Sequence, residues 1–279
     1  MKKDKTAIHP SGQKIYFDEE KHIYWMDDGT TFTSATKWLD SFFNEFNMEE
    51  VASRYARKHM IDIREVKAMW TRKGQLARDY GTAMHEYAEF VLTEQQNKIK
   101  NPTAKYVLSE ISQEAMRSTQ SMNKILKEQK DFIRKEINTR RYVDMCIQNM
   151  LKDYEFVESE KIIFSPEYKI SGTIDLLLYH KKLKTYAICD WKTNEKIRFD
   201  NPWQSGKGCI NHLEDCNANH YYLQLNLYKQ ILLNEKYYDA NIELFIIHIG
   251  PLFYNWYAVP DMTTEIHAMI KEKNELNTL

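Results

Sequence analysis

The segment AICDWKTN places an acid and a base two positions apart near the end of a short apolar stretch. Since side chains alternate across an extended strand, Asp190 and Lys192 project to one face while Trp191 points away. A carboxylate there can hold Mg²⁺ or Mn²⁺ against a phosphate, and the neighbouring ammonium can orient the attacking water and offset developing charge. The pair suits phosphodiester hydrolysis, although an Asp-x-Lys triplet by itself is also common at exposed strand ends.

A second acid, Asp175, interrupts the apolar run IDLLL in the preceding segment ISGTIDLLLYH. A carboxylate in such a run is costly to bury unless it is paired, hydrogen-bonded or bound to a metal ion. An antiparallel connection between the two segments would bring Asp175 beside Asp190 at one edge of a sheet. The alternative is a strand-end aspartate that points to water. Glu160, in the strand before Asp175, is a further acid that could face the same edge.

Two polar pairs have helical spacing. His85 and Glu89 are four residues apart, as are Gln224 and Tyr228, so the members of each pair share a helix face. Each pair also has an ordinary structural explanation, because a helical histidine is often a hydrogen-bonded core residue and Gln with Tyr often forms a polar rim. Their order along the chain relative to the two acids is what favours a functional role.

Taken in order, these residues fall in four motifs that resemble the RecB-like branch of the PD-(D/E)XK nuclease superfamily. That family begins with Gly-x-x-x-His on a helix, matched by GTAMHEYAE, and continues with Gly-x-x-Asp, matched by GTID. Asp-x-Lys, matched by DWK, and Gln-x-x-x-Tyr on the next helix, matched by QLNLY, complete the series. The pattern is most similar to phage and mitochondrial genome maintenance-type exonucleases. The motif residues are His85, Asp175, Asp190, Lys192, Gln224 and Tyr228.

The resemblance implies a role in chemistry for four of these positions and for the neighbouring Trp191. His85, Asp175 and Asp190 would hold the metal ion, which would be Mg²⁺ or Mn²⁺. The main-chain carbonyl of Trp191 would be a further ligand, and Lys192 would assist catalysis. The implied fold is a restriction-endonuclease-like α/β core, in which a mixed central sheet is flanked by helices.

Contacts to DNA are implied for two further regions. Gln224 and Tyr228 lie close to the site and the DNA in that family. The Ser-x-Thr segment, here Ser34 and Thr36, approaches single-stranded DNA in the related exonucleases, although an ordinary helix cap explains both residues as well. The accessory candidates at the site are Glu89 and Glu160.

The leading hypothesis for function is a metal-dependent DNA exonuclease that acts on single strands or ends in phage-type replication, recombination or repair. An endonuclease is the closest alternative, because the site fixes bond cleavage and not whether the substrate presents an end. A catalytically silent DNA-binding or assembly module would have lost an acid or the lysine, and those positions are filled. An unrelated metal-dependent hydrolase would be distinguished by its substrate. The sequence has no Walker motif, so a helicase would be a separate partner, alongside replication or recombination proteins.

The elements that would position these residues begin with a mainly helical half. A small hairpin over 14–25 precedes a helix capped by Thr33 or Ser34. From Met48 to about Gln96 the pattern is helical, and Gly74 and Gly81 are expected to interrupt it. After Pro102 a long polar, locally basic helix runs to about Met150; it could line a nucleic-acid path or be a solvated amphipathic helix.

The second half changes character at about Asp153. The segments YEFVESEKIIF, ISGTIDLLLYH and KTYAICDWKT predict an antiparallel meander, and a helix, two strands and a closing helix follow. The sequence therefore predicts one α/β nuclease domain over 1–279. Its parts are a mainly helical region at 30–150 that contributes His85, a catalytic sheet core at 153–258 and a C-terminal helix at 261–279.

Composition narrows the class without naming a substrate. The formal net charge of -1 gives no global attraction to a polyanion, so DNA binding would depend on a local patch. No apolar run is long enough to span a membrane, and no secretion signal is evident, so no membrane partner is expected. The four cysteines are irregularly spaced, which argues against disulfides and against an iron-sulfur cluster. The expected compartment is the cytoplasm, that of a bacterial host if the chain is phage-encoded.

Overall fold

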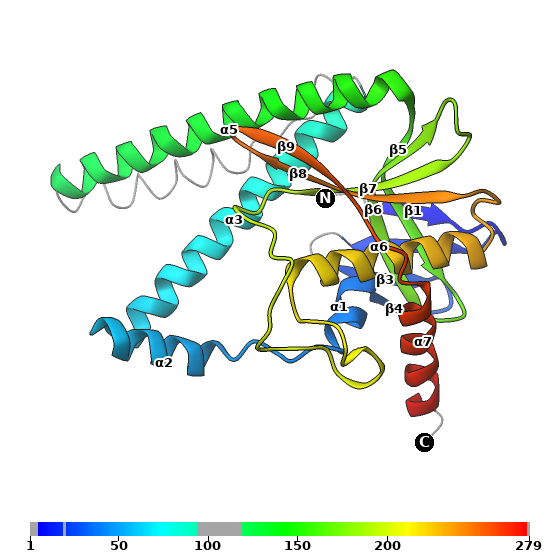
Figure 1. Cartoon of the computed structure of the whole chain (residues 1–279), viewed down its shortest axis with the longest axis horizontal. Helices are drawn as coiled ribbons and strands as arrows, with labels where there is room; N and C mark the ends of the chain where they lie inside the picture. The colour runs from blue at the N-terminus through cyan, green and yellow to red at the C-terminus, as the bar shows by residue number, and fades with distance from the viewer. Residues whose placement is uncertain (1–4, 19–20, 94–118, 278–279) are drawn as a thin grey trace.

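The computed structural model describes residues 5–18, 21–93 and 119–277, which form a mixed sheet with helices on both faces (Figure 1). The strand order is β1-β2-β3-β4-β6-β7-β8-β9, and β5 pairs with β6. The β4–β6 and β7–β8 pairs are parallel and the others antiparallel. The strands are β1 (Lys5–Ile8), β2 (Lys14–Asp18), β3 (Ile23–Met26), β4 (Thr31–Ser34), β5 (Tyr154–Ser165), β6 (Ile170–His180), β7 (Tyr186–Lys192), β8 (Ile242–Gly250) and β9 (Phe253–Ala258).

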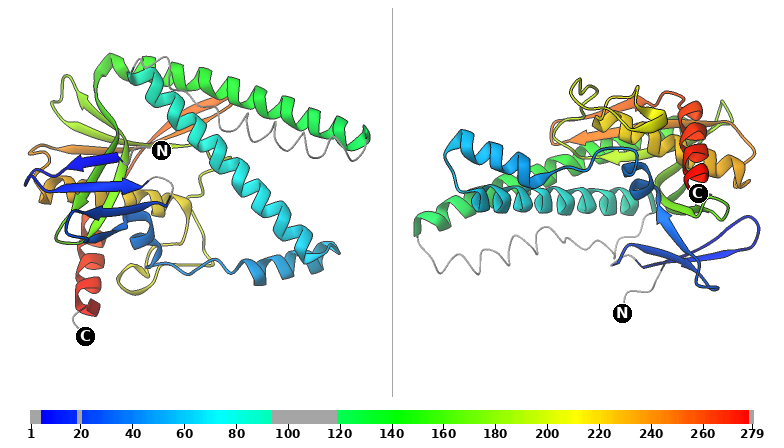
Figure 2. Two further views of the ribbon diagram at one scale, coloured as in Figure 1. Left: turned by 180° about the vertical axis from the view of Figure 1, so that it is seen from behind. Right: turned by 90° about the horizontal axis from the view of Figure 1, so that it is seen from below.

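The helices form two layers around the central strands. Alternate side chains of β6 and β7 point to opposite faces: Leu177 and Ile188 pack with α1, α6 and α7, whereas Leu176 and Cys189 pack with α3 and α5. Beyond the sheet, α3 continues as an arm with α2 at its far end (Figures 1 and 2). The helices are α1 (Ala35–Asp40), α2 (Met48–His59), α3 (Ile63–Thr93), α5 (Thr119–Asp153), α6 (Asn217–Asn234) and α7 (Thr263–Asn277), with a short 3₁₀ turn η1 (Gly208–Ile210).

Strand β6 has a split edge. Strand β5 pairs along one whole side of it, whereas β4 pairs only at Ile170 and Ser171 and β7 only from Leu176 onward. Because a strand has two hydrogen-bonding sides, β4 and β7 share the other side. The stretch 172–175, which ends at Asp175, lies between them and is laddered only to β5. The sheet thus opens at the position of the predicted acid.

The mixed α/β architecture predicted from the sequence is confirmed, and so is the order of the meander and the elements after it. The expected interruptions at Gly74 and Gly81 are wrong, because α3 runs through both glycines. An interior glycine costs a helix only about 1 kcal/mol, which packing can offset. The helix breaks instead after His59, where Met60 adopts a left-handed backbone with φ 56°.

Two other expectations need qualification. The long helix expected from Pro102 to Met150 lies partly outside the described residues; within them, α5 begins at Thr119 and ends at Asp153. The expected hairpin is present as β2 and β3, but β4 adds a strand that the sequence did not indicate. Ser34 ends that strand and caps α1, since its side chain accepts a hydrogen bond from Lys37 N.

A buried asparagine fixes α6 against the start of α7. The Asn226 side chain donates to the carbonyls of Tyr222 and Pro260 and accepts a hydrogen bond from Met262 N. All its polar atoms are therefore satisfied although it is fully buried. In the part of the chain that the structure describes, no helix has the length and hydropathy to cross a bilayer.

Candidate active site

The predicted acids meet at the catalytic edge, the corner of the sheet where β5, β6 and β7 carry Glu160, Asp175 and Asp190. Ser159 pairs with Leu176 and Lys161 with Ile174, so Glu160 lies opposite Asp175. The β6–β7 ladder ends at Leu176 and Cys189, so one step further places Asp175 next to Asp190. Strand register thus brings three acids together from segments that are apart in the sequence.

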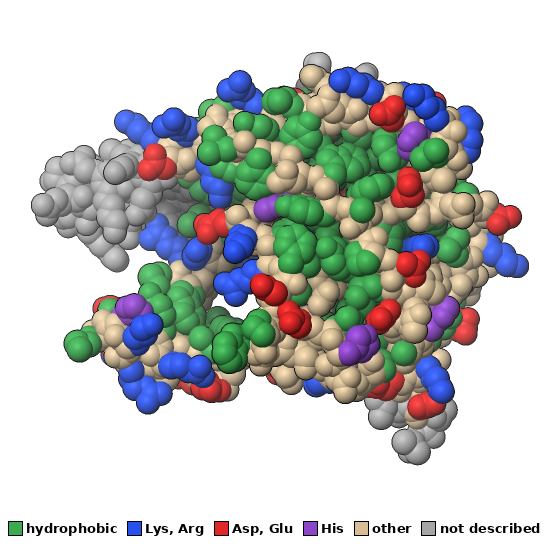
Figure 3. Space-filling model, in the orientation of Figure 1, with side chains coloured by type: hydrophobic (Ala, Val, Ile, Leu, Met, Phe, Trp, Pro, Cys, Tyr) green, Lys and Arg blue, Asp and Glu red, His purple; other side chains and the backbone are tan. Residues whose placement is uncertain are grey.

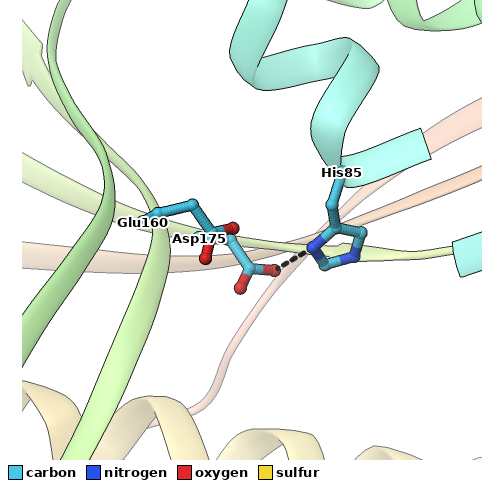
Figure 4. A group of neighbouring side chains, drawn as sticks. All are labelled: His85, Glu160 and Asp175. Carbon is cyan, nitrogen blue, oxygen red and sulfur yellow. Dashed lines mark ion pairs between the residues drawn. The ribbon is translucent and has the colours of Figure 1, made fainter. Parts of the chain in front are cut away.

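Asp175 is held by β7 and faces α3. Its Oδ2 accepts a hydrogen bond of 2.9 Å from Trp191 N and lies 3.6 Å from His85 Nδ1. The other imidazole nitrogen, His85 Nε2, is 3.1 Å from the Trp191 carbonyl oxygen. Figure 4 shows His85 Nδ1 directed at the Asp175 carboxylate. If Nε2 donates to the Trp191 carbonyl, Nδ1 keeps its lone pair and can bind a metal ion. Helix α3 therefore delivers His85 to both groups that the sequence assigned to the same metal ion.

Glu160 completes a compact donor group with His85 and Asp175. One ligand atom of each residue lies within 4.8 Å of the others, and Figure 4 shows the two carboxylates gathered beside the imidazole ring. Glu160 has a left-handed backbone, φ 50°, which is unfavourable for a side chain of this type and turns it out of the regular strand alternation. Burial, and next the charge of Asp175, raises the pKa of Glu160 to about 7.

This donor group fits a divalent cation. Two carboxylates and one imidazole are ligands that Mg²⁺ and Mn²⁺ accept, and the Trp191 carbonyl lies next to the imidazole. The neighbouring negative charges disfavour ionisation of Glu160, and a cation between the carboxylates would relieve that repulsion. The sequence pointed to Glu160 only as an accessory acid, because its opposition to Asp175 depends on strand register.

Asp190 and Lys192 form a buried ion pair beside this group. The carboxylate of Asp190 contacts Lys192 Nζ, and Asp190 is only 3% exposed. Burial raises the pKa of Asp190 to about 6, against the opposing effect of Lys192. Burial disfavours the charge on Lys192, but Asp190 and Asp175 outweigh it and raise the pKa of the lysine, which stays protonated at neutral pH. Asp190 is directed to Lys192 here and lies outside the compact group of three donors.

Gln224 and Tyr228 lie one helical turn apart on α6, as predicted. Gln224 Nε2 donates to the Tyr228 hydroxyl at 3.0 Å. Tyr228 is 4% exposed, and its ring packs directly on the backbone of Gly172. A Cβ atom added at Gly172 would lie only 2.5 Å from the Cε1 atom of the ring. Tyr228 thus fills the split in β6 and offers almost no surface to a substrate, whereas Gln224 is half-buried and keeps an accessible part.

The remaining predicted residues have local explanations. Ser34 is half-buried and caps α1, and its hydroxyl is 3.4 Å from that of exposed Thr36. Glu89 lies one turn beyond His85 on α3, and its charge contributes to the raised pKa of Glu160 without joining the donor group. The structure therefore gathers His85, Asp175 and Glu160 most tightly, with Glu89 in a surrounding position.

A cavity of about 1650 Å³ begins next to Lys192. Thr193 and Asn194, which follow the lysine, line it, and so does Tyr221, whose ring centroid is 4.6 Å from Lys192 Nζ. The residues 43–47 between α1 and α2 also line it. Figure 3 shows the molecule hollowed between the α2–α3 arm and the rest of the chain. This cavity could not be predicted from the sequence, because its lining residues come from segments far apart in the chain.

The fold and the site define a metal-dependent nuclease class, and comparison with known families gives the same answer. A family model described as the PD-(D/E)XK nuclease superfamily matches residues 52–272. The chain belongs to this superfamily, as the motifs predicted. Its members are generally metal-dependent nucleases that act on DNA. No curated protein matches the chain.

Proposed function

We propose that this chain is a divalent-metal-dependent deoxyribonuclease that acts as an exonuclease on single strands or strand ends. His85, Asp175 and Asp190 would hold the cation together with the Trp191 carbonyl, and Glu160 is an additional ligand candidate. The compact donor group at the split edge of β6 supports His85, Asp175 and Glu160 as ligands, and strand register supports Asp190 beside them. A bound Mg²⁺ or Mn²⁺ would act as a Lewis acid toward the phosphate and lower the pKa of a bound water.

The residues of the chain itself supply the remaining chemistry. Lys192 stays protonated beside Asp190, so it can orient the attacking water and offset the negative charge that develops on the phosphate. Gln224 presents its accessible amide next to this lysine-bearing edge, and Tyr228 holds that amide through its hydroxyl. Gln224 is therefore proposed as the DNA contact and Tyr228 as the residue that positions it.

The cavity beside Lys192 is the observation that carries the preference for single strands and ends. It has protein on several sides: α3 and α5, the α1–α2 connection and the loop after β7. A flexible single strand can follow such an enclosed path, and basic side chains with aromatic rings are what bind it without sequence preference. Both kinds are present among the lining residues, including Lys73, Lys135, Phe46 and Tyr80. A rigid duplex would need a more open surface.

The test is a comparison of substrate topologies with Mn²⁺ or Mg²⁺ present. We expect linear single-stranded DNA to be degraded to short products, circular single-stranded DNA of the same sequence to resist, and chelation of the metal ion to stop the reaction. The Asp190→Ala variant should be inactive on every substrate. Cleavage of the circle at the same rate as the linear strand would establish the endonuclease alternative, and a wild type that cuts no DNA would refute the proposal.

A further inference from the structure

The cavity beside the site has a positively charged side, the α3–α5 wall. Three of the lining residues contributed by α3 and α5 are basic and none is acidic. On α1, α2 and the loops, acidic lining residues such as Asp40, Glu45 and Asp200 are mixed with the basic Arg54, Lys196 and Arg198, so only the α3–α5 side combines cations with no acid. A polyanion in this cavity would therefore lie against the α3–α5 wall. Its lining residues are Lys73, Leu76, Ala77, Arg78, Tyr80, Phe132 and Lys135.

One acid reaches this wall from the loop directly after the catalytic strand. Glu195, three residues beyond Lys192, places its Oε2 3.8 Å from Lys73 Nζ. Both side chains are about three quarters exposed, at 73% for Lys73 and 76% for Glu195. An ion pair so open to water contributes little to stability, so its partners separate readily.

A second lysine on the wall is fixed more firmly. Lys135 is half-buried, and its Nζ lies 4.3 Å from the ring centroid of Tyr80, whose hydroxyl is hydrogen-bonded to Thr139. Burial lowers the pKa of Lys135, while the negative charge of Glu195 opposes that shift. Glu195 thus acts electrostatically on Lys135 as well as on Lys73. Glu195 is therefore within ion-pair distance of Lys73 and affects Lys135 through its charge.

We propose that Lys73 and Lys135 form a subsite for the phosphodiester backbone of the DNA, and that Glu195 occupies this subsite until a phosphate displaces it. This inference rests on the proposed nuclease function and adds a binding site to it. A phosphodiester carries the same single negative charge as Glu195 and presents two non-bridging oxygens, so it can pair with the same ammonium groups. Glu195 then competes with the DNA for the two lysines. An anion that binds them more weakly than Glu195 does would not displace it.

The position of the subsite along α3 defines which part of the strand it contacts. Lys73 precedes His85 by twelve residues on one continuous helix, which corresponds to about 18 Å along the axis. The subsite therefore contacts the strand several nucleotides away from the scissile phosphate. Its effect should appear in DNA affinity rather than in the bond-breaking step.

The experiment measures the binding of a fluorescent single-stranded oligonucleotide by anisotropy over a series of salt concentrations, in buffer with a metal chelator so that no cleavage occurs. Removing the competing carboxylate with Glu195→Gln should tighten binding about threefold, in line with the worth of an exposed ion pair. Removing the cation with Lys73→Gln should weaken binding and reduce the slope of log K against log salt by about 0.7, the loss of one phosphate contact on a single strand.

A second ion pair that involves α3 provides the control. Lys67 on α3 contacts Glu49 on α2, and neither residue lines the cavity. Lys67→Gln and Glu49→Gln make the same changes in net charge as the two test variants, so they should shift the affinity by less than about twofold. If Glu49→Gln tightens binding as much as Glu195→Gln does, net charge alone is responsible and the subsite is refuted.

The inference and the proposed function fail in different ways. A wild type that cuts DNA, combined with a Glu195→Gln variant that binds with wild-type affinity, would overturn the subsite and leave the nuclease proposal in place. A wild type that cuts no DNA would overturn the nuclease proposal in the separate cleavage assay. Retention of the full salt slope in Lys73→Gln would also overturn the subsite, since no phosphate contact would have been lost.

Discussion

The catalytic edge and the α3–α5 wall both contain a lysine–carboxylate pair, but the two pairs differ in their access to water. The side chains of Asp190 and Lys192 are only 5% and 18% exposed, whereas those of Lys73 and Glu195 are about three quarters exposed. Breaking a buried pair leaves an uncompensated charge, which is strongly unfavourable, while an exposed pair separates at little expense. The first pair can therefore hold a fixed geometry, whereas the second can exchange its partner. Substitutions should therefore have large effects at the first and graded effects at the second.

The largest expected effect comes from Lys192→Met at the catalytic edge. Because we propose that this cation offsets charge that develops in the transition state, we expect the cleavage rate to fall at least about a hundredfold. Binding of Mn²⁺ should persist, since His85, Asp175 and Glu160 remain. Rates of oligonucleotide cleavage and calorimetric titration with Mn²⁺ would separate the two effects.

The matched control for that variant is Lys229→Met. Lys229 lies on α6 and pairs with Asp261 at 3.1 Å, away from the donor group. Its removal should leave the cleavage rate within about twofold of the wild type, as for other exposed pairs. Loss of Mn²⁺ binding in Lys192→Met would contradict the assignment and show that the lysine maintains the metal site.

A smaller loss of activity is expected for Glu160→Gln, which tests whether Glu160 is a metal ligand. Replacing a carboxylate near the ion should weaken metal affinity about tenfold to a hundredfold, and high Mn²⁺ should restore much of the activity. The measurement is the cleavage rate as a function of Mn²⁺ concentration. Glu158→Gln is the control, because Glu158 is exposed on the same strand and pairs with Lys161. Equal metal dependence in the two variants would remove Glu160 from the ligand set.

Gly172→Ala tests the packing behind the catalytic edge. The added Cβ would lie within 2.9 Å of three Tyr228 atoms, so we expect a loss of about 1–3 kcal/mol in the free energy of unfolding, together with weaker positioning of Gln224. Gly74→Ala makes the same change where the nearest atom is Arg78 Nη1 at 3.5 Å, and it should stabilise the helix by about 0.5–1 kcal/mol. Chemical denaturation measures both values. A stable Gly172→Ala protein would mean that Tyr228 has room to move.

The smallest effect should come from the cavity, with Phe46→Ala. Phe46 is 66% exposed and lines the cavity, so its ring is available for stacking on a base. Its loss should weaken single-strand binding about fivefold, at the low end of what base stacking contributes. Met60→Ala is the control, because Met60 is 95% exposed at the end of α2 and does not line the cavity. Anisotropy would compare the two, and equal affinities would exclude stacking on Phe46.

The sequence predicted those parts of the site that depend on local order. The Asp-x-Lys spacing and the antiparallel meander are local properties of neighbouring segments, so the approach of Asp175 to β7 could be inferred from the antiparallel connection between them. The approach of His85 could not, because it requires α3 to pack across the sheet; only the family resemblance suggested it. The superfamily was confirmed by the family match, whereas the individual ligand roles remain predictions.

What the sequence missed depends on backbone detail and on distant segments. Glu160 joins the donor group because of its register against β6 and its left-handed backbone. Neither feature can be predicted from the sequence around a glutamate. Glu195 and Lys73 form an ion pair although they are far apart in the sequence, so their spacing along the chain could not predict the contact. The prediction that the helix is interrupted at Gly74 and Gly81 was wrong because packing outweighed the low helix propensity of glycine. The interruption lies at Met60 instead.

The parallel pairing of β4 with β6 also constrains the order of events during synthesis. Thr33 and Ser34 leave the ribosome early, yet their partners Ile170 and Ser171 are made much later. Until then the edge of β4 has no strand to pair with, and contacts of such high sequence separation form slowly. Short edge strands limit the aggregation that an unpaired edge invites, and β4 has only four residues. The split in β6 can therefore form only after the nascent chain has delivered β6, so the site is assembled late in folding.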